Sequence, residues 1–185
     1  MYANSLTALR IALMIPFFGF MINAPTPLRG MALVAFLAAG LTEIADGYVA
    51  RRLGEASKFG AMFDLIADRI LTITVVVALI ASRALAGPFV IAGVILIARD
   101  VIVAGLNEAL PGRLTIRVTP IERVKIALQF IAFAILIAPN WGSPWSGLLQ
   151  YEIGAWTLLA AAALAAFTTY QYCREAVPLF RPKRR

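Results

Sequence analysis

The chain has 185 residues, of which 61% are hydrophobic and 15% are charged. Soluble globular domains have roughly 45–50% apolar and about 25% charged residues, so this composition excludes a water-soluble domain. The mean hydropathy is +0.83, and the apolar runs reach the roughly 20 residues that cross a bilayer. These features predict an all-α polytopic membrane protein with a single membrane domain, residues 1–185.

Two residue counts restrict the chemistry further. Histidine is absent, and Cys173 is the single cysteine. A histidine general base, a Ser–His–Asp triad and a histidine-ligated metal site are therefore excluded. An internal disulfide is excluded as well, since it requires two cysteines.

Apolar segments separated by turn-forming residues predict six transmembrane helices. In chain order, these are Ser5–Ile22, Arg29–Arg52, Gly60–Ser82, Gly87–Ala109, Pro120–Ala138 and Ile153–Cys173. The connection before the sixth helix contains Trp141, Trp145 and Tyr151. Because Trp and Tyr collect at membrane–water interfaces, these residues predict an aromatic belt in an external loop.

Lysine and arginine residues are unevenly divided between the two predicted sides of the membrane. If the N-terminus is cytoplasmic, the cytoplasmic segments hold twelve of the seventeen cations, and the external segments hold Arg29 and Arg83. Cytoplasmic loops carry the excess of such residues, so both termini are predicted to be cytoplasmic, as in a bacterial inner-membrane protein. The net charge of +7 favours anionic lipid headgroups and phosphorylated metabolites as partners, and no nucleic acid is expected.

Four of the ten acids lie where the second predicted helix ends and the third begins. Glu43 and Asp46 share one helical face, and Asp64 and Asp68 share another, because residues three or four apart lie on the same side of a helix. The short connection predicts that the two helices are antiparallel neighbours, so the four carboxylates are expected to converge. Such carboxylates favour hard divalent cations, and two ions can clamp the oxygens of a displacement at phosphorus.

Glycines and an arginine accompany these acids. Gly47 and Gly60 leave room for a bulky group such as a nucleotide, and Arg51 is a possible bidentate partner for phosphate. The alternative is that the acids form interhelical salt bridges with Arg51, Arg52 and Arg69. Carboxylates within a membrane are functional by default, which favours the metal site.

The pattern Asp-Gly-x2-Ala-Arg-x8-Gly-x3-Asp-x3-Asp resembles the signature of the CDP-alcohol phosphatidyltransferases. It is formed by Asp46, Gly47, Ala50, Arg51, Gly60, Asp64 and Asp68. The resemblance implies six transmembrane helices, usually in a homodimer. It also implies that Mg2+ or Mn2+, with two ions expected, assists the displacement of CMP from a CDP-linked alcohol by the hydroxyl of a second alcohol.

The resemblance also implies roles for individual residues. Asp46, Asp64 and Asp68 are expected to ligate the metals, together with Glu43, which stands where the family pattern has Asp. Asp68 is in addition the expected base that takes the hydroxyl proton. The CDP-binding residues implied by the motif are Gly47, Ala50, Arg51 and Gly60.

Three further segments resemble particular members of this family: the first is similar to phosphatidylglycerophosphate synthases and cardiolipin synthases, and the other two are similar to phosphatidylglycerophosphate synthases. They are Asn4-Ser5-Leu6-Thr7-x2-Arg10, Ala98-Arg99-Asp100 with Gly105-Leu106-Asn107-Glu108, and Val118-Thr119 with Arg123-Val124-Lys125 and Gln129. The resemblance implies transfer from CDP-diacylglycerol to glycerol 3-phosphate, and Arg99, Arg123 and Lys125 suit the phosphate of that acceptor. Two alternatives stay open: transfer to phosphatidylglycerol, as in cardiolipin synthases, and a divalent-cation transporter.

Overall fold

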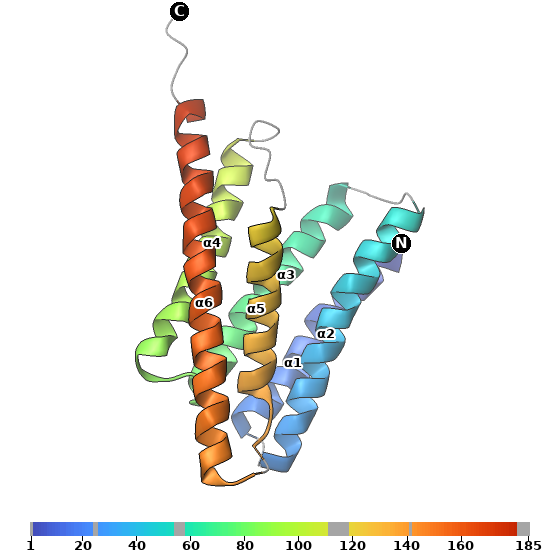
Figure 1. The fold of residues 1–185 in the computed structure, drawn as a ribbon. Coiled ribbons are helices and arrows are strands. Elements are labelled where there is room, and N and C mark those ends of the chain that lie inside the picture. Colours follow the sequence, from blue (N-terminus) through green and yellow to red (C-terminus); the bar gives the residue numbers. More distant parts are fainter. Residues whose placement is uncertain (1, 24–25, 54–57, 111–118, 141, 181–185) are drawn as a thin grey trace, which may run out of the picture.

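The structure is a computed structural model that describes residues 2–23, 26–53, 58–110, 119–140 and 142–180. Over these residues, it consists of six α-helices and two short 3-10 helices, without a strand (Figure 1). The α-helices are α1 (Tyr2–Asn23), α2 (Thr26–Leu53), α3 (Lys58–Ala81), α4 (Val90–Ala109), α5 (Pro120–Ile137) and α6 (Pro144–Ala176), and the 3-10 helices are η1 (Gly87–Phe89) and η2 (Val177–Phe180). The predicted all-α class is confirmed.

The first five helices begin and end within about three residues of the predicted positions, but the sixth begins well before Ile153. The Ser143 side chain caps α6 by accepting a hydrogen bond from the Ser146 backbone N–H at 3.4 Å, and Pro144 occupies the first turn. Serine at the cap followed by proline is a typical helix start. The prediction that Trp145 and Tyr151 lie in a loop is therefore wrong, because both belong to α6.

Helix α1 packs extensively against both α2 and α3, whereas α6 packs against α4 and α5. Figure 1 shows α2 and α3 running in opposite directions, as predicted. Among the described residues, however, α2 and α3 do not form an extensive contact with each other. Buried apolar side chains of α1, including Met14 and Phe17, lie in the core that joins these helices. Among the described residues, α1 therefore contacts both helices. The side chains at the end of α2, where the carboxylates are predicted to converge with those of α3, lie outside the described part.

An aromatic cluster joins α2 to α5 in the middle of the bundle. The Phe36 ring stacks on Phe130 with a centroid distance of 4.8 Å and meets Phe133 edge-on at 6.2 Å. Gly40 permits this approach, since a Cβ atom there would collide with the Phe130 ring. Paired aromatic rings contribute about 0.5–1.5 kcal/mol beyond their buried area. The cluster therefore fixes α2 against α5 beside the cavity described below.

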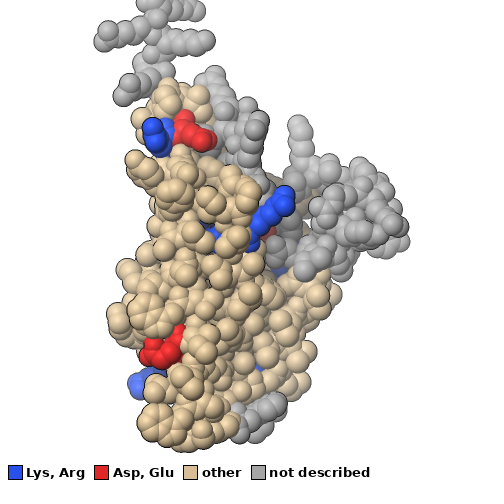
Figure 2. All heavy atoms as spheres, viewed as in Figure 1, with Lys and Arg blue, Asp and Glu red and all other residues tan. Residues whose placement is uncertain are grey.

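The outer surface of the bundle is strongly apolar. Two segments, Gly87–Ala109 and Pro144–Leu179, are long and apolar enough to cross a membrane, and Thr7–Ile22 and Arg29–Thr42 form shorter apolar segments. Within the most apolar stretch of each long segment, only 22% and 39% of the residues are buried in the bundle, so the others are half-buried or exposed. Figure 2 accordingly shows a face with few charged side chains among the described residues. Large exposed apolar surfaces mark contact with a membrane or a partner.

The beginning of α1 and the end of α6 lie at the same end of the bundle (Figure 1). The C-terminal ends of α2 and α4 and the N-terminal ends of α3 and α5 lie there as well. Of the twelve predicted cytoplasmic cations, the six within described helices belong to this end, whereas Arg29 and Arg83 belong to the opposite end; the six are Arg51, Arg52, Lys58, Arg123, Lys125 and Arg174. The other six lie outside the described residues. The helix arrangement is therefore consistent with the charge asymmetry seen in the sequence.

Candidate active site

The predicted carboxylates and nucleotide-binding residues belong to the end of α2 and the beginning of α3. Asp68 lies on α3, and its side chain is described, as is the position of Gly60. The remaining predicted residues of this group lie within the same two helices, but their side chains are outside the described part of the structure. They are Glu43, Asp46, Gly47, Ala50, Arg51 and Asp64.

Asp68 is held by an arginine from the first helix. The Arg10 guanidinium donates a hydrogen bond from Nη1 to the Asp68 carboxylate at 2.5 Å. The Arg10 side chain is completely buried, whereas the Asp68 side chain is 42% exposed. A hydrogen bond between two charged groups is stronger than one between neutral groups. The contact therefore fixes one face of Asp68 against α1 while leaving the carboxylate accessible.

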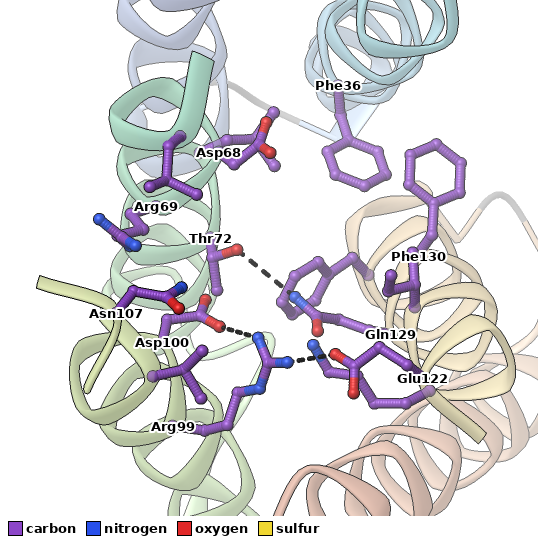
Figure 3. A pocket seen from close by; sticks show the side chains of 16 residues that line it. Phe36, Asp68, Arg69, Thr72, Arg99, Asp100, Asn107, Glu122, Gln129 and Phe130 are labelled. Carbon is purple, nitrogen blue, oxygen red and sulfur yellow. Dashed lines mark hydrogen bonds and ion pairs between the residues drawn. The ribbon is translucent and has the colours of Figure 1, made fainter. Parts of the chain in front are cut away.

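A cavity of about 210 Å³ extends from Asp68 into the bundle between α3, α4 and α5. In Figure 3, Asp68 lies at one end, Arg99, Asp100 and Glu122 gather at the other, and Thr72 and Gln129 lie between them. Pockets that enclose drug-sized ligands have volumes of about 300–1,000 Å³. The cavity is smaller, and charged groups line both of its ends, so its dimensions suit a small polar molecule.

Arg99 is the centre of the charged group at the far end. Its Nη1 donates to Asp100 at 2.9 Å, and its Nη2 donates to the Glu122 carboxylate. Asp100 follows Arg99 on α4, while Glu122 comes from the first turn of α5, so the second ion pair joins two helices. Ionisable residues within a membrane protein usually pair in this way and mark functional sites.

Lys125 lies one turn after Glu122 and also lines the cavity. Only 4% of the residue is exposed. Among the described residues, its ammonium group forms neither a hydrogen bond nor an ion pair. A buried ammonium group without a partner is costly, because burial removes the water that stabilises its charge. This cation is therefore available to an anionic ligand.

The structure separates the three cations that the sequence groups as an acceptor site. Arg99 and Lys125 line the cavity, whereas Arg123 is exposed and is not among the lining residues. The reason is helical geometry, since Glu122, Lys125 and Gln129 recur at spacings of three and four residues and share one face of α5. Arg123 projects from another face.

Sequence reasoning missed Glu122. Its signal was the sequence Thr119-Pro120-Ile121-Glu122, because threonine followed three residues later by glutamate is typical of a helix start. The Thr119 hydroxyl indeed accepts a hydrogen bond from the Glu122 backbone N–H at 3.2 Å. Arg10 had been noted in the N-terminal segment, but its pairing with Asp68 could not be read from residues 58 positions apart.

The cavity brings a carboxylate and two cations together. The Asp68 carboxylate lies at one end and Arg99 lies at the other (Figure 3). Lys125 lines the same cavity near Arg99. The lining therefore offers both a hydrogen-bond acceptor and cations to a small polar molecule.

Known proteins resemble the chain over most of its length. A Rickettsia felis protein named CDP-diacylglycerol--glycerol-3-phosphate 3-phosphatidyltransferase is 34% identical over 154 residues, which cover 82% of each chain. A protein of the same name from Rickettsia bellii is 31% identical over 180 residues, covering 96% of each chain. The Escherichia coli (strain K12) protein of that name is 29% identical over 163 residues, covering 83% of this chain and 88% of its own.

The family model for CDP-alcohol phosphatidyltransferase matches residues 1–168. This range includes the complete signature from Asp46 to Asp68 as well as Arg99, Glu122 and Lys125. The chain therefore belongs to the CDP-alcohol phosphatidyltransferase family.

Proposed function

We propose that the protein transfers the phosphatidyl group of CDP-diacylglycerol to glycerol 3-phosphate, giving phosphatidylglycerophosphate and CMP. The observation that carries this proposal is the cavity that connects Asp68 of the family signature with Arg99 and Lys125. The names of the similar proteins from Rickettsia and Escherichia coli specify the same donor and acceptor. The protein is thus an enzyme of phospholipid biosynthesis.

The reaction is a displacement at the phosphorus that carries the diacylglycerol group. The acceptor hydroxyl oxygen forms a bond to this phosphorus, and the bond from the phosphorus to the oxygen bridging to CMP breaks. Asp68 takes the hydroxyl proton, and CMP leaves with the electron pair of the broken bond. A positioned base of this kind accelerates a reaction by about 10²- to 10⁴-fold. Arg10 orients the Asp68 carboxylate through their hydrogen bond.

Arg99 and Lys125 bind the phosphate of the acceptor. The Arg99 guanidinium is already oriented by Asp100 and Glu122, so little side-chain freedom is lost on binding. The Lys125 ammonium group, which has no direct hydrogen bond or ion pair among the described residues, gains one from the phosphate. The phosphate therefore anchors the acceptor at one end of the cavity, with its free hydroxyl directed toward Asp68.

We extend the proposal to the metal and the nucleotide. Glu43, Asp46, Asp64 and Asp68 supply only oxygen donors, the donor type that Mg2+ and Mn2+ prefer. The described side chains include just one of these four, and they contain no group of three metal-ligating residues. When bound, such ions neutralise charge on the reacting phosphate oxygens. The nucleotide-binding residues of the proposal are Gly47, Ala50, Arg51 and Gly60.

We also propose that all six helices span a bacterial inner membrane, with both termini and the active site on the cytoplasmic side. Two long apolar segments and the outward-facing apolar residues support a membrane location. The excess of cations at one end of the bundle supports the orientation. A homodimer follows only from the family resemblance, and cross-linking in membranes would test it.

An acceptor panel tests the proposed function. Purified protein in detergent with CDP-diacylglycerol and Mg2+ or Mn2+ should release CMP when glycerol 3-phosphate is added, and not without an acceptor. Release with phosphatidylglycerol but not with glycerol 3-phosphate would favour the cardiolipin-type transfer. Binding of Mn2+ without CMP release for any acceptor would favour the transporter.

A further inference from the structure

Glu122 is placed unusually for a residue at the third position of a helix. In the capping arrangement that Thr119 and Glu122 suggest, the glutamate side chain turns back to the backbone N–H of the threonine. Here, the Thr119 hydroxyl caps the helix, but the described contacts of the Glu122 carboxylate are with Arg99 instead. The side chain therefore points into the cavity rather than toward its own helix end (Figure 3).

The ion pair between Arg99 and Glu122 leaves one carboxylate oxygen unused. Glu122 Oε1 accepts from Arg99, whereas Oε2 is buried and has no hydrogen-bond partner among the described residues. The Glu122 side chain is only 7% exposed. A buried acceptor of this kind is expected to find a donor, because leaving it unpaired is costly.

The cavity end near Arg99 offers both a cation and a hydrogen-bond acceptor, so a ligand that carries an anionic group and a hydroxyl group matches it. Among the described residues, Lys125 has no hydrogen bond or ion pair, and one helical turn earlier the Oε2 atom of Glu122 accepts no hydrogen bond. A phosphate group fits the first and is repelled by the second. A hydroxyl group fits the second, because a carboxylate is a strong hydrogen-bond acceptor. A polyol phosphate with a hydroxyl next to the phosphate-bearing carbon supplies both.

We propose that Glu122 determines acceptor specificity by accepting a hydrogen bond from the middle hydroxyl of the polyol phosphate. The inference rests on the proposed function, in which the phosphate lies on Arg99 and Lys125 and the reacting hydroxyl lies at Asp68. Glu122 then distinguishes glycerol 3-phosphate from acceptors that carry the same phosphate and the same terminal hydroxyl but no hydroxyl between them.

The experiment combines two acceptors with two variants. CMP release is measured with glycerol 3-phosphate and with 3-hydroxypropyl phosphate, which lacks the middle hydroxyl. The unaltered protein should prefer glycerol 3-phosphate by about tenfold or more in kcat/KM, the effect of one hydrogen bond to a charged group. Glu122→Ala should abolish this preference by lowering kcat/KM for glycerol 3-phosphate more than for 3-hydroxypropyl phosphate. A loss shared by both acceptors reflects the orientation of Arg99, which binds their common phosphate. Glu122→Leu keeps most of the side-chain volume and should lose the same preference as Glu122→Ala. It provides a second variant if the alanine variant does not fold.

Asp100→Ala is the matched control, because Asp100 is the other carboxylate that holds Arg99. It should reduce activity with both acceptors by the same factor and leave the preference intact. Equal losses for both acceptors with Glu122→Ala would overturn the inference, since they would indicate that Glu122 only orients Arg99. A lower KM for glycerol 3-phosphate in Glu122→Ala would also overturn it, because Glu122 would then compete with the phosphate. No CMP release by the unaltered protein with either acceptor would overturn the proposed function itself.

Discussion

Replacing Lys125 by methionine removes the cavity cation that has no ion-pair partner among the described residues. The residue is 4% exposed, so a bound phosphate meets its ammonium group largely without competing water. A hydrogen bond to a charged group contributes about 1.5–3 kcal/mol, and about 1.36 kcal/mol corresponds to a factor of ten. We therefore expect kcat/KM for glycerol 3-phosphate to fall by about ten- to a hundredfold.

The same substitution should not destabilise the protein. Methionine has a similar length and no charge to desolvate, so the melting temperature in detergent is expected to stay the same or to rise. Loss of activity without loss of stability separates a binding role from a structural one. The assay is CMP release at varied glycerol 3-phosphate and saturating CDP-diacylglycerol, with melting followed on the same preparations.

Arg123→Met is the matched control, because Arg123 is a cation two residues away that is exposed and does not line the cavity. Surface substitutions usually change free energies by less than about 0.5 kcal/mol, so its effect on kcat/KM should stay within about twofold. Equal losses for Lys125→Met and Arg123→Met would refute the reasoning. They would indicate a general attraction by positive charge rather than binding in the cavity.

Three further substitutions and one treatment test other parts of the site and fold. Asp68→Asn should lower kcat by about 10²-fold or more while the circular dichroism of the protein stays unchanged, and near-normal kcat would exclude Asp68 as the base. Chelation of divalent ions by EDTA should abolish CMP release, and added Mg2+ or Mn2+ should restore it. Glu43→Asp should retain or raise activity. A complete loss of activity in Glu43→Asp would show that the longer side chain is required. In Gly154→Val, the added Cβ lies 2.8 Å from Leu136 Cγ. This overlap should lower the free energy of unfolding by about 1–3 kcal/mol and therefore lower the melting temperature. An unchanged melting temperature would argue against this close contact of α5 and α6.

The helices were predictable because their signals are local. Apolar runs and turn-forming residues located the first five to within about three residues. The start of α6 differs from the prediction, because Trp145 and Tyr151 suggest an interfacial loop but belong to the helix. The serine at 143 and the proline at 144 are a typical helix start. The contact of α1 with both α2 and α3 could not be derived from loop length. A short connection fixes the relative direction of the two helices that it joins, but it does not determine where a third helix packs.

Helical spacing predicts which side chains share a face. Asp68 and Lys125, both predicted from the sequence as site residues, line the same cavity, and the spacing of Glu122, Lys125 and Gln129 separates Arg123 from them once one face is chosen. Contacts between distant segments were not predictable in the same way. The pairs Arg10–Asp68 and Arg99–Glu122 join different helices, and only the packed bundle brings their side chains together.

The central claim is that an acceptor hydroxyl bound in this cavity attacks the phosphorus of CDP-diacylglycerol. The most direct measurement uses glycerol 3-phosphate that carries 18O in its terminal hydroxyl, followed by mass spectrometry of the lipid product and of CMP. We predict phosphatidylglycerophosphate that retains the label and CMP that is unlabelled. CMP released together with unlabelled phosphatidic acid would contradict the claim, because water rather than the bound acceptor would then be the nucleophile.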